Sequence, residues 1–151
     1  MKREIGDECS LEKEIETAIN NIGNSYAPYS DFYVSAVLVT KSGKMYLGNN
    51  IENASYSLTI CAERNAFFTA VREGNRDFDY IVIVGGKEGN ITDYCSPCGA
   101  CRQVMQEFCE EGFRIVLAKS INEYKVYTLK ELLPLAFSED SMAEITTERK
   151  N

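Results

Sequence analysis

The stretch that decides the fold is Tyr80-Ile-Val-Ile-Val-Gly-Gly86, an apolar run ended by two glycines. A strand with one face in water would alternate apolar and polar residues, and this run does not alternate. The pattern is typical of a strand that is buried on both faces. Because helices must then cover both faces of its sheet, the sequence predicts an α/β protein.

Outward from this strand, the sequence predicts further helices and strands. Apolar residues at helical spacing predict helices at 11–22, 58–72, 99–111 and 129–133. Strand patterns lie at 32–40, 45–50, 113–118 and 125–128, and Lys41-Ser-Gly-Lys44 is typical of a hairpin turn. The order of these elements favours a three-layer α/β/α fold. Its sheet is expected to be mixed and five-stranded, opened by an antiparallel hairpin.

The length and charge of the chain limit its class. Its 151 residues suit one domain, which we expect at 1–138, followed by a disordered polar tail at 139–151. The net charge of −7 argues against a nucleic-acid polymer as partner. No apolar run is long enough for a membrane span, and the N-terminus lacks the apolar stretch of a secretory signal. We therefore expect a cytoplasmic protein without a membrane partner.

Three cysteines and one glutamate indicate a metal site. The chain contains no histidine, so a tightly bound zinc ion must be held by thiolates. Cys98 and Cys101 are three residues apart at the start of a predicted helix, and Cys61 stands near the start of another. Because helix N-termini stabilise thiolates, Cys61, Cys98 and Cys101 are the candidate zinc ligands. Three protein ligands leave a fourth position open for water, as in catalytic zinc sites.

Two charged neighbours complete the expected chemistry. Glu63 lies two residues after Cys61 and is the natural proton carrier, because no histidine is present. Three thiolates on one dication carry a formal charge of −1, which weakens its Lewis acidity. Arg64 is therefore expected to donate hydrogen bonds to the ligand sulfurs.

Other interpretations of the cysteines stay open at this point. Cys95 or Cys109 could supply a fourth thiolate to a structural zinc site. Cys95, Cys98 and Cys101 also form an evenly spaced row that an iron–sulfur site can use, and Cys98 with Cys101 could form a redox pair. Cys9 and Cys109 are expected to be ordinary thiols on or near helices.

Three motifs carry a family resemblance. They are Asn50-Ile-Glu-Asn-Ala-Ser-Tyr56, Thr59-Ile-Cys-Ala-Glu-Arg-Asn65 and Ser96-Pro-Cys-Gly-Ala-Cys-Arg-Gln103. Together they closely resemble the small homotetrameric, zinc-dependent cytidine deaminases of nucleoside salvage, and flanking segments extend the resemblance over roughly residues 12–138. The resemblance implies zinc on the three cysteines, with Glu63 as proton shuttle. It also implies hydrolytic deamination of cytidine and 2′-deoxycytidine by zinc-activated water.

The resemblance implies particular contacts to a nucleoside. Asn50 and Glu52 would hydrogen-bond the ribose hydroxyls, and Phe32 would pack against the pyrimidine ring. The backbone of Ala62 would bind the base edge, and Ser96 would face the departing ammonia.

The resemblance also implies a homotetramer in which neighbouring subunits share their active sites. Tyr56 would lie at a subunit interface close to the ligand. Phe137 would enter the pocket of a neighbour.

Three other functions are weighed against cytidine deamination. A related group deaminates blasticidin, a cytosine-bearing antibiotic, but lacks the ribose-binding pattern that starts at Asn50. A non-catalytic zinc protein that binds nucleosides would have no use for Glu63. A deaminase of polynucleotides would need a basic groove, which an acidic chain does not suggest.

Overall fold

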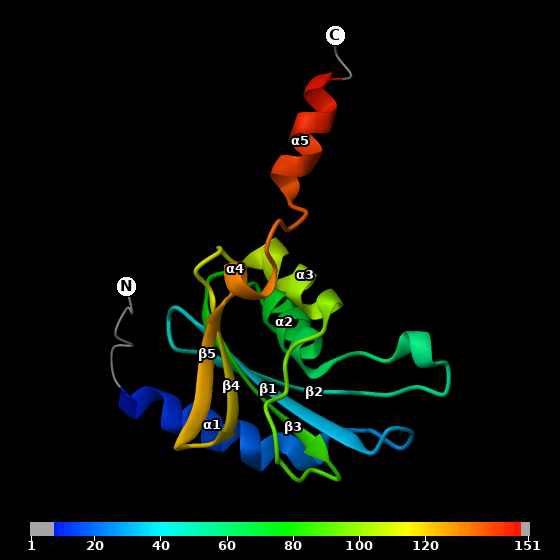
Figure 1. Cartoon of the computed structure of the whole chain (residues 1–151), viewed down its shortest axis with the longest axis vertical. Helices are drawn as coiled ribbons and strands as arrows, with labels where there is room; N and C mark the ends of the chain where they lie inside the picture. The colour runs from blue at the N-terminus through cyan, green and yellow to red at the C-terminus, as the bar shows by residue number, and fades with distance from the viewer. Residues whose placement is uncertain (1–7, 149–151) are drawn as a thin grey trace.

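The computed structural model describes residues 8–148, with side chains described from residue 11 to residue 143. Five strands form one sheet with the order β2-β1-β3-β4-β5 (Figure 1). Their bounds are β1 Phe32–Thr40, β2 Met45–Asn49, β3 Phe78–Lys87, β4 Arg114–Ser120 and β5 Glu123–Thr128. β3 and β4 are parallel, and the β1–β2, β1–β3 and β4–β5 pairings are antiparallel. The predicted mixed five-stranded sheet and its opening hairpin are confirmed.

Helices cover both faces of the sheet, which confirms the three-layer prediction. Helix α1 (Glu8–Asn21) lies on one face, and α2 (Ala62–Arg72) and α3 (Gly99–Phe108) lie on the other (Figure 1). The short helix α4 (Leu129–Leu132) packs beside α3. Within β3, Val82 and Val84 belong to the core under α1, whereas Ile81 and Ile83 belong to the core under α2 and α3. The run is apolar at every position because alternate residues point to opposite faces of the sheet and fill two different cores.

Helix α2 begins four residues later than the sequence predicts, and this difference positions the candidate metal site. The apolar residues before it fit a helical period, but Ile60 instead pairs with Ile51 through two backbone hydrogen bonds of 3.0 Å. Tyr56–Leu58 forms a separate 3-10 turn, η2. Cys61 is then extended, with φ −71° and ψ 155°, and stands directly before the first residue of α2.

Two other boundaries near the site also differ from prediction. Helix α3 ends at Phe108 rather than at residue 111, because Cys109 turns to an extended conformation with φ −128° and ψ 153°. Strand β3 continues through both glycines to Lys87, because Gly85 and Gly86 pair with residues of β1. A Cβ at Gly85 would lie 2.7 Å from Cys95 Sγ and 3.3 Å from Phe32 Cε1. Glycine is therefore needed at this position because the Cys95 and Phe32 side chains pack onto the strand.

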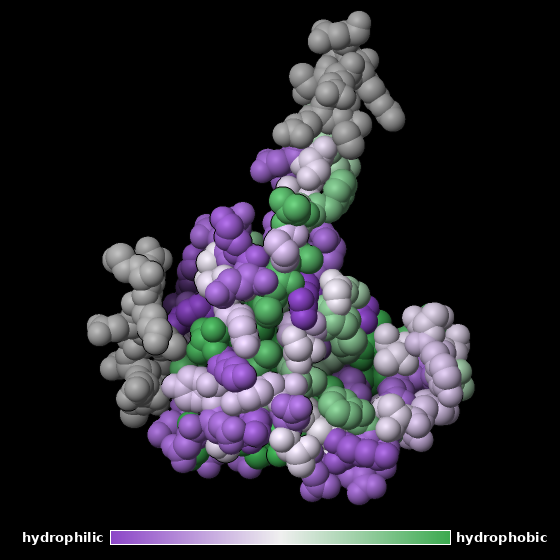
Figure 2. Space-filling model, in the orientation of Figure 1, coloured by the Kyte–Doolittle hydropathy of each residue, from purple (hydrophilic) through white to green (hydrophobic). Residues whose placement is uncertain are grey.

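The C-terminal segment, residues 133–148, contains a further helix, whereas the sequence predicts a disordered tail at 139–151. Glu139–Glu148 forms helix α5, which projects away from the sheet (Figure 1). Leu135, Phe137 and Met142 are exposed on this segment, and Figure 2 shows apolar surface where it leaves the body of the protein. Within residues 8–148, no helix combines the length and the apolar character needed to cross a membrane.

Candidate active site

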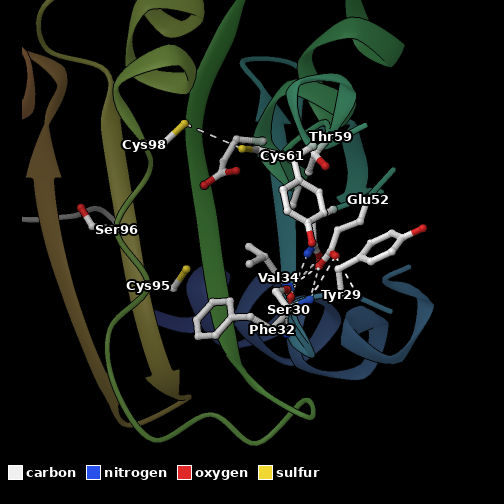
Figure 3. Close-up of a pocket in the computed structure, with 14 residues that line it drawn as sticks. Tyr29, Ser30, Phe32, Val34, Glu52, Thr59, Cys61, Cys95, Ser96 and Cys98 are labelled. Carbon is white, nitrogen blue, oxygen red and sulfur yellow. Dashed lines mark hydrogen bonds between the residues drawn. The ribbon is translucent and has the colours of Figure 1, made fainter. Parts of the chain in front are cut away.

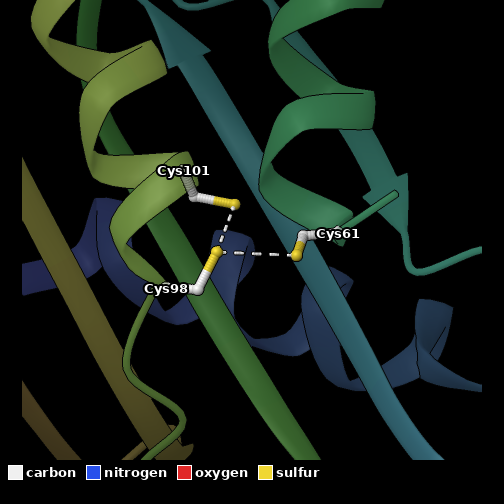
Figure 4. A group of neighbouring side chains, drawn as sticks. All are labelled: Cys61, Cys98 and Cys101. Atoms are coloured by element: carbon white, nitrogen blue, oxygen red, sulfur yellow. Dashed lines mark hydrogen bonds between the residues drawn. The ribbon is translucent and has the colours of Figure 1, made fainter. Parts of the chain in front are cut away.

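Three thiols lie together at the N-termini of α2 and α3 (Figure 4). The Sγ atom of Cys98 lies 3.7 Å from that of Cys61 and 3.5 Å from that of Cys101. Ligands at about 2.3 Å in a tetrahedral zinc site are separated by about 3.8 Å, so these spacings match three corners of such a site. The donor set therefore fits one zinc ion per chain, with one corner left for a non-protein ligand.

The electrostatics around the sulfurs favour a thiolate at Cys61. Arg64 donates a 3.4 Å hydrogen bond from Nη2 to Cys61 Sγ, as predicted. Hydrogen bonds from Cys101 and Arg64 lower the pKa of Cys61 to about 5, despite its partial burial. The Cys101 pKa is raised, because hydrogen bonding with Cys61 and burial both favour its protonated form. A bound dication would displace the thiol protons of its ligands.

Glu63 is buried beside Cys101, in the first turn of α2. Its side chain is only 4% exposed, and its Oε2 atom accepts a 3.6 Å hydrogen bond from Cys101 Sγ. Burial raises the pKa of Glu63 to about 7. A carboxyl group with this pKa can both accept and release a proton near neutral pH, which suits general acid–base chemistry.

A cavity of about 530 Å³ opens in front of these groups (Figure 3). Most of the residues predicted for the site line it, namely Phe32, Asn50, Glu52, Tyr56, Cys61, Ala62, Glu63, Ser96 and Cys98. Cys101 and Arg64 do not line it; Cys101 contacts the lining residue Cys98, and Arg64 contacts the lining residue Cys61. The cavity thus combines a thiol cluster, a buried acid and an aromatic side chain, which suits a ligand of nucleoside size.

Phe137 is the one predicted site residue that lies away from this cavity within the chain. Its side chain is 57% exposed, and its backbone carbonyl accepts a 2.9 Å hydrogen bond from Gln103 Nε2. Gln103 is the second residue after Cys101, so the C-terminal segment is attached to the helix that carries two of the thiols.

Two polar side chains at the far end of the cavity are fixed by backbone groups. Asn50 accepts a 2.9 Å hydrogen bond from the Val34 N–H and donates one of 2.8 Å to the Phe32 carbonyl. Glu52 accepts hydrogen bonds from Tyr29 and Ser30, and the Ser30 contacts lower its pKa. An ionised carboxylate therefore faces the cavity opposite the thiols.

Five lining residues were missed by the sequence analysis: Tyr29, Ser30, Val34, Thr59 and Cys95. The period of two in β1 could have identified Val34, because it shares a face with Phe32. Tyr29 and Ser30 fall inside a segment that fits the family resemblance, but no local pattern marks their contacts to Glu52.

Cys95 lines the cavity without joining the thiol cluster. Among the described residues, the group that can hold a metal consists of Cys61, Cys98 and Cys101. Burial raises the pKa of the Cys95 thiol to about 12. Cys109 packs against the core under α2 and α3. Neither cysteine supplies a fourth ligand, so the structure favours an open zinc site over a four-thiolate or iron–sulfur site. The side chain of Cys9 lies outside the described residues.

Comparison with known proteins decides the family. Residues 9–117 match the family model described as the cytidine and deoxycytidylate deaminase zinc-binding region. The chain belongs to the cytidine and deoxycytidylate deaminase family. It is 42% identical over 133 residues to a cytidine deaminase of Sporosarcina psychrophila, covering 88% of this chain and 95% of the relative. The crystal structure of cytidine deaminase from Burkholderia pseudomallei superposes on this deaminase-family fold with a TM-score of 0.76. It shares 43% identity and covers 83% of this chain and 97% of its own.

A blasticidin-S deaminase of Bacillus cereus is also similar, at lower identity. It is 31% identical over 128 residues, covering 82% of this chain and 89% of the relative. Within the deaminase family, the chain is therefore more similar to the two cytidine deaminases above than to this blasticidin-S deaminase.

Proposed function

We propose that this protein hydrolyses cytidine and 2′-deoxycytidine to the corresponding uridines and ammonia, in pyrimidine salvage. One observation carries the proposal: buried Glu63 stands beside the three-thiol cluster at the wall of a nucleoside-sized cavity. The names of the more similar relatives support cytidine as the substrate. In the net reaction, the carbon–nitrogen bond to the exocyclic amine breaks, and a carbon–oxygen bond to a water oxygen forms.

Cys61, Cys98 and Cys101 would hold the zinc ion. When bound, zinc supplies a Lewis acid that lowers the pKa of water from about 16 to about 7. Arg64 donates to Cys61 and places a positive charge beside the thiolates. This charge offsets the excess negative charge of three sulfurs around one dication, and it makes Arg64 a positioning residue.

Glu63 is the proposed proton carrier. Its carboxylate takes a proton from the attacking water and delivers it to the pyrimidine ring nitrogen beside the reacting carbon. A second transfer through the same carboxyl group delivers a proton to the departing amine. The pKa of about 7 fits this role, because each transfer needs the group to change its protonation state in every turnover.

The remaining lining residues are proposed to position the nucleoside. Asn50 and Glu52 bind the sugar hydroxyls, and a substrate that lacks them would leave the remaining lone pairs of the buried carboxylate without donors. The Phe32 ring packs against the base. At the opposite end, the Ala62 backbone binds the base edge, and the exposed Ser96 faces the leaving ammonia.

We further propose that the protein is a homotetramer whose subunits share their sites. Tyr56 lines the cavity yet is 74% exposed, and Phe137 is 57% exposed on the C-terminal segment. A second copy that covers Tyr56 would narrow the cavity mouth, and Phe137 would enter the cavity of a neighbour. Light scattering tests this state, with four chains per particle expected and one chain contradictory. A reducing compartment such as the cytoplasm would keep the three thiols available for metal.

A substrate panel tests the proposed function. Purified protein loaded with zinc is mixed separately with cytidine, 2′-deoxycytidine, blasticidin S and single-stranded DNA. Loss of the cytosine absorbance band is expected for the first two only. Blasticidin S is the second candidate substrate because the B. cereus enzyme is a relative. Turnover of blasticidin S alone, or nucleoside binding without turnover, would replace the proposal by one of its alternatives.

A further inference from the structure

We propose that Ser30 is a positioning residue that makes turnover depend on the sugar of the substrate. The inference rests on the proposed function and deepens it, because it concerns the same cavity. Ser30 has no expected role in the chemistry itself. Its contacts instead join the groups proposed to bind the sugar to the group proposed to bind the base.

The first set of contacts fixes the Glu52 carboxylate. The Ser30 hydroxyl donates to Oε1, and the Ser30 N–H lies 3.3 Å from Oε1 and 3.2 Å from Oε2. The Tyr29 N–H donates to Oε2 at 3.1 Å. Both carboxylate oxygens are therefore held from one side by this turn (Figure 3). Because each oxygen can accept more than one hydrogen bond, lone pairs remain for hydroxyl donors in the cavity.

The second contact links the same hydroxyl to the aromatic residue. The Phe32 N–H donates to Ser30 Oγ at 3.1 Å, and the Phe32 carbonyl accepts from Asn50 at 2.8 Å. The Ser30 hydroxyl thus donates to Glu52 and accepts from Phe32. The proposed sugar contacts and the proposed base contact are therefore held in one hydrogen-bonded frame.

The backbone conformation that permits this frame is an unusual one. Asp31, between Ser30 and Phe32, has a φ of 59°, in the left-handed region that residues other than glycine rarely adopt. It is held there at both ends: its N–H donates to the Ala27 carbonyl at 3.0 Å, and its carbonyl accepts from the Glu88 N–H at 2.7 Å. This turn directs the N–H groups of Tyr29 and Ser30 toward Glu52 and sends Phe32 into β1.

A fixed carboxylate should discriminate strongly between substrates with and without sugar hydroxyls. The Glu52 carboxylate is already ordered before the substrate binds. Less of the binding free energy is therefore spent on ordering this side chain. A substrate without hydroxyls covers the ionised carboxylate but leaves its remaining lone pairs without donors. Without the Ser30 hydroxyl, Glu52 loses a charge-assisted hydrogen bond and is held only by the backbone N–H groups of Tyr29 and Ser30. We therefore expect selectivity for the sugar to fall.

The test compares cytidine with 2′,3′-dideoxycytidine, which keeps the base and lacks both sugar hydroxyls. In the wild type, kcat/KM should favour cytidine. Ser30→Ala should lower the ratio of the two kcat/KM values about tenfold, the equivalent of one charge-assisted hydrogen bond. A displaced Phe32 or a small loss of folded protein would affect both substrates alike and cancel in the ratio.

Two further variants separate the hydroxyl from the shape of the side chain. Ser30→Thr keeps a hydroxyl and should retain most of the selectivity, whereas Ser30→Val has a similar shape without it and should behave as Ser30→Ala does. Ser25→Ala is the matched control, because Ser25 donates to the Val34 carbonyl on the same strand without lining the cavity. For Ser25→Ala, the ratio of the kcat/KM values for cytidine and 2′,3′-dideoxycytidine should equal the wild-type ratio.

The outcomes separate this inference from the proposed function. A zinc-loaded wild type that deaminates neither nucleoside overturns the proposed function. A wild type that deaminates cytidine, with the ratio unchanged in Ser30→Ala and Ser30→Val, overturns the role of Ser30 alone. Equal kcat/KM for both nucleosides in the wild type would also overturn it.

Discussion

Glu63 and Cys101 lie on different helices, yet the Glu63 Oε2 atom is 3.6 Å from the Cys101 sulfur. A carboxylate in this position would lie beside any metal held by the three thiols and would face the same cavity. Burying a carboxyl group costs free energy, because a group at the surface stays hydrated. A purely structural acid would not need to be buried at this cost. The side-by-side packing of the N-termini of α2 and α3 therefore places a buried carboxyl group next to the three thiols.

Metal binding should depend on the three clustered thiols and not on Cys95. Cys98→Ala removes one of three ligands and should leave less than one zinc per chain after dialysis. Cys95→Ala is the matched control, since Cys95 lines the cavity outside the cluster. Elemental analysis should find one zinc per chain in this control and in the wild type. Loss of zinc from Cys95→Ala would favour the four-thiolate alternative.

Arg64 should affect activity more than folding. Arg64→Gln removes the positive charge beside Cys61, and we expect a loss of about 10- to 100-fold in zinc affinity or kcat/KM. Arg72→Gln, at the exposed end of the same helix, is the control and should match the wild type. Steady-state kinetics and zinc titration with a competing chelator measure both quantities. Equal behaviour of the two variants would contradict the role of Arg64.

Arg102 should hold the loop before α3 to the C-terminal part of the chain. Its guanidinium donates to the Pro97 carbonyl at 2.8 Å, the Leu132 carbonyl at 2.6 Å and the Ser96 hydroxyl at 3.0 Å. Arg102→Ala should lower the free energy of unfolding by about 1.5–3 kcal/mol, since these contacts involve a charged donor.

Urea unfolding at fixed protein and zinc concentration measures this loss. Arg76→Ala, at an exposed position, serves as the control and should change the midpoint little. A midpoint for Arg102→Ala equal to that of Arg76→Ala would show that the three contacts contribute nothing.

Gly85 should be needed for the shape of the cavity. A methyl group there would lie 2.7 Å from Cys95 Sγ and 2.9 Å from Cys95 Cβ, so Gly85→Ala must push Cys95 away from the sheet. We expect about 1–3 kcal/mol of destabilisation from this overpacking, together with a higher KM for cytidine.

The double variant Gly85→Ala/Cys95→Gly makes room for the added methyl group and should recover part of both losses. Thermal unfolding measures the loss of stability, and steady-state kinetics measure the change in KM for cytidine. A wild-type KM in Gly85→Ala would mean that Cys95 does not limit the cavity.

The strands and the metal ligands could be predicted from the sequence because their signals are local. β1 has the predicted bounds, Phe32–Thr40, since most of its residues are of types that favour strands. Three thiols in a chain without histidine left few alternatives for a zinc site. These features depend on residue type and spacing, which the sequence displays directly.

The features that were missed depend on contacts between distant segments. The start of α2 was predicted too early because the pairing of Ile60 with Ile51 overrides the helical spacing of the apolar residues. Ser30 looks like an ordinary turn residue until Glu52, 22 positions away, is placed beside it. Tertiary hydrogen bonds of this kind leave no periodic signal in the chain.

The most direct test of the account is the deamination rate of Glu63→Gln at measured zinc content. Glutamine has the same shape and cannot carry a proton, so one zinc per chain should remain while kcat for cytidine falls about 10²–10⁴-fold. Glu107→Gln, an exposed acid on α3, should keep the wild-type rate. A zinc-loaded Glu63→Gln that converts cytidine at the wild-type rate would contradict the proposal that Glu63 carries the protons.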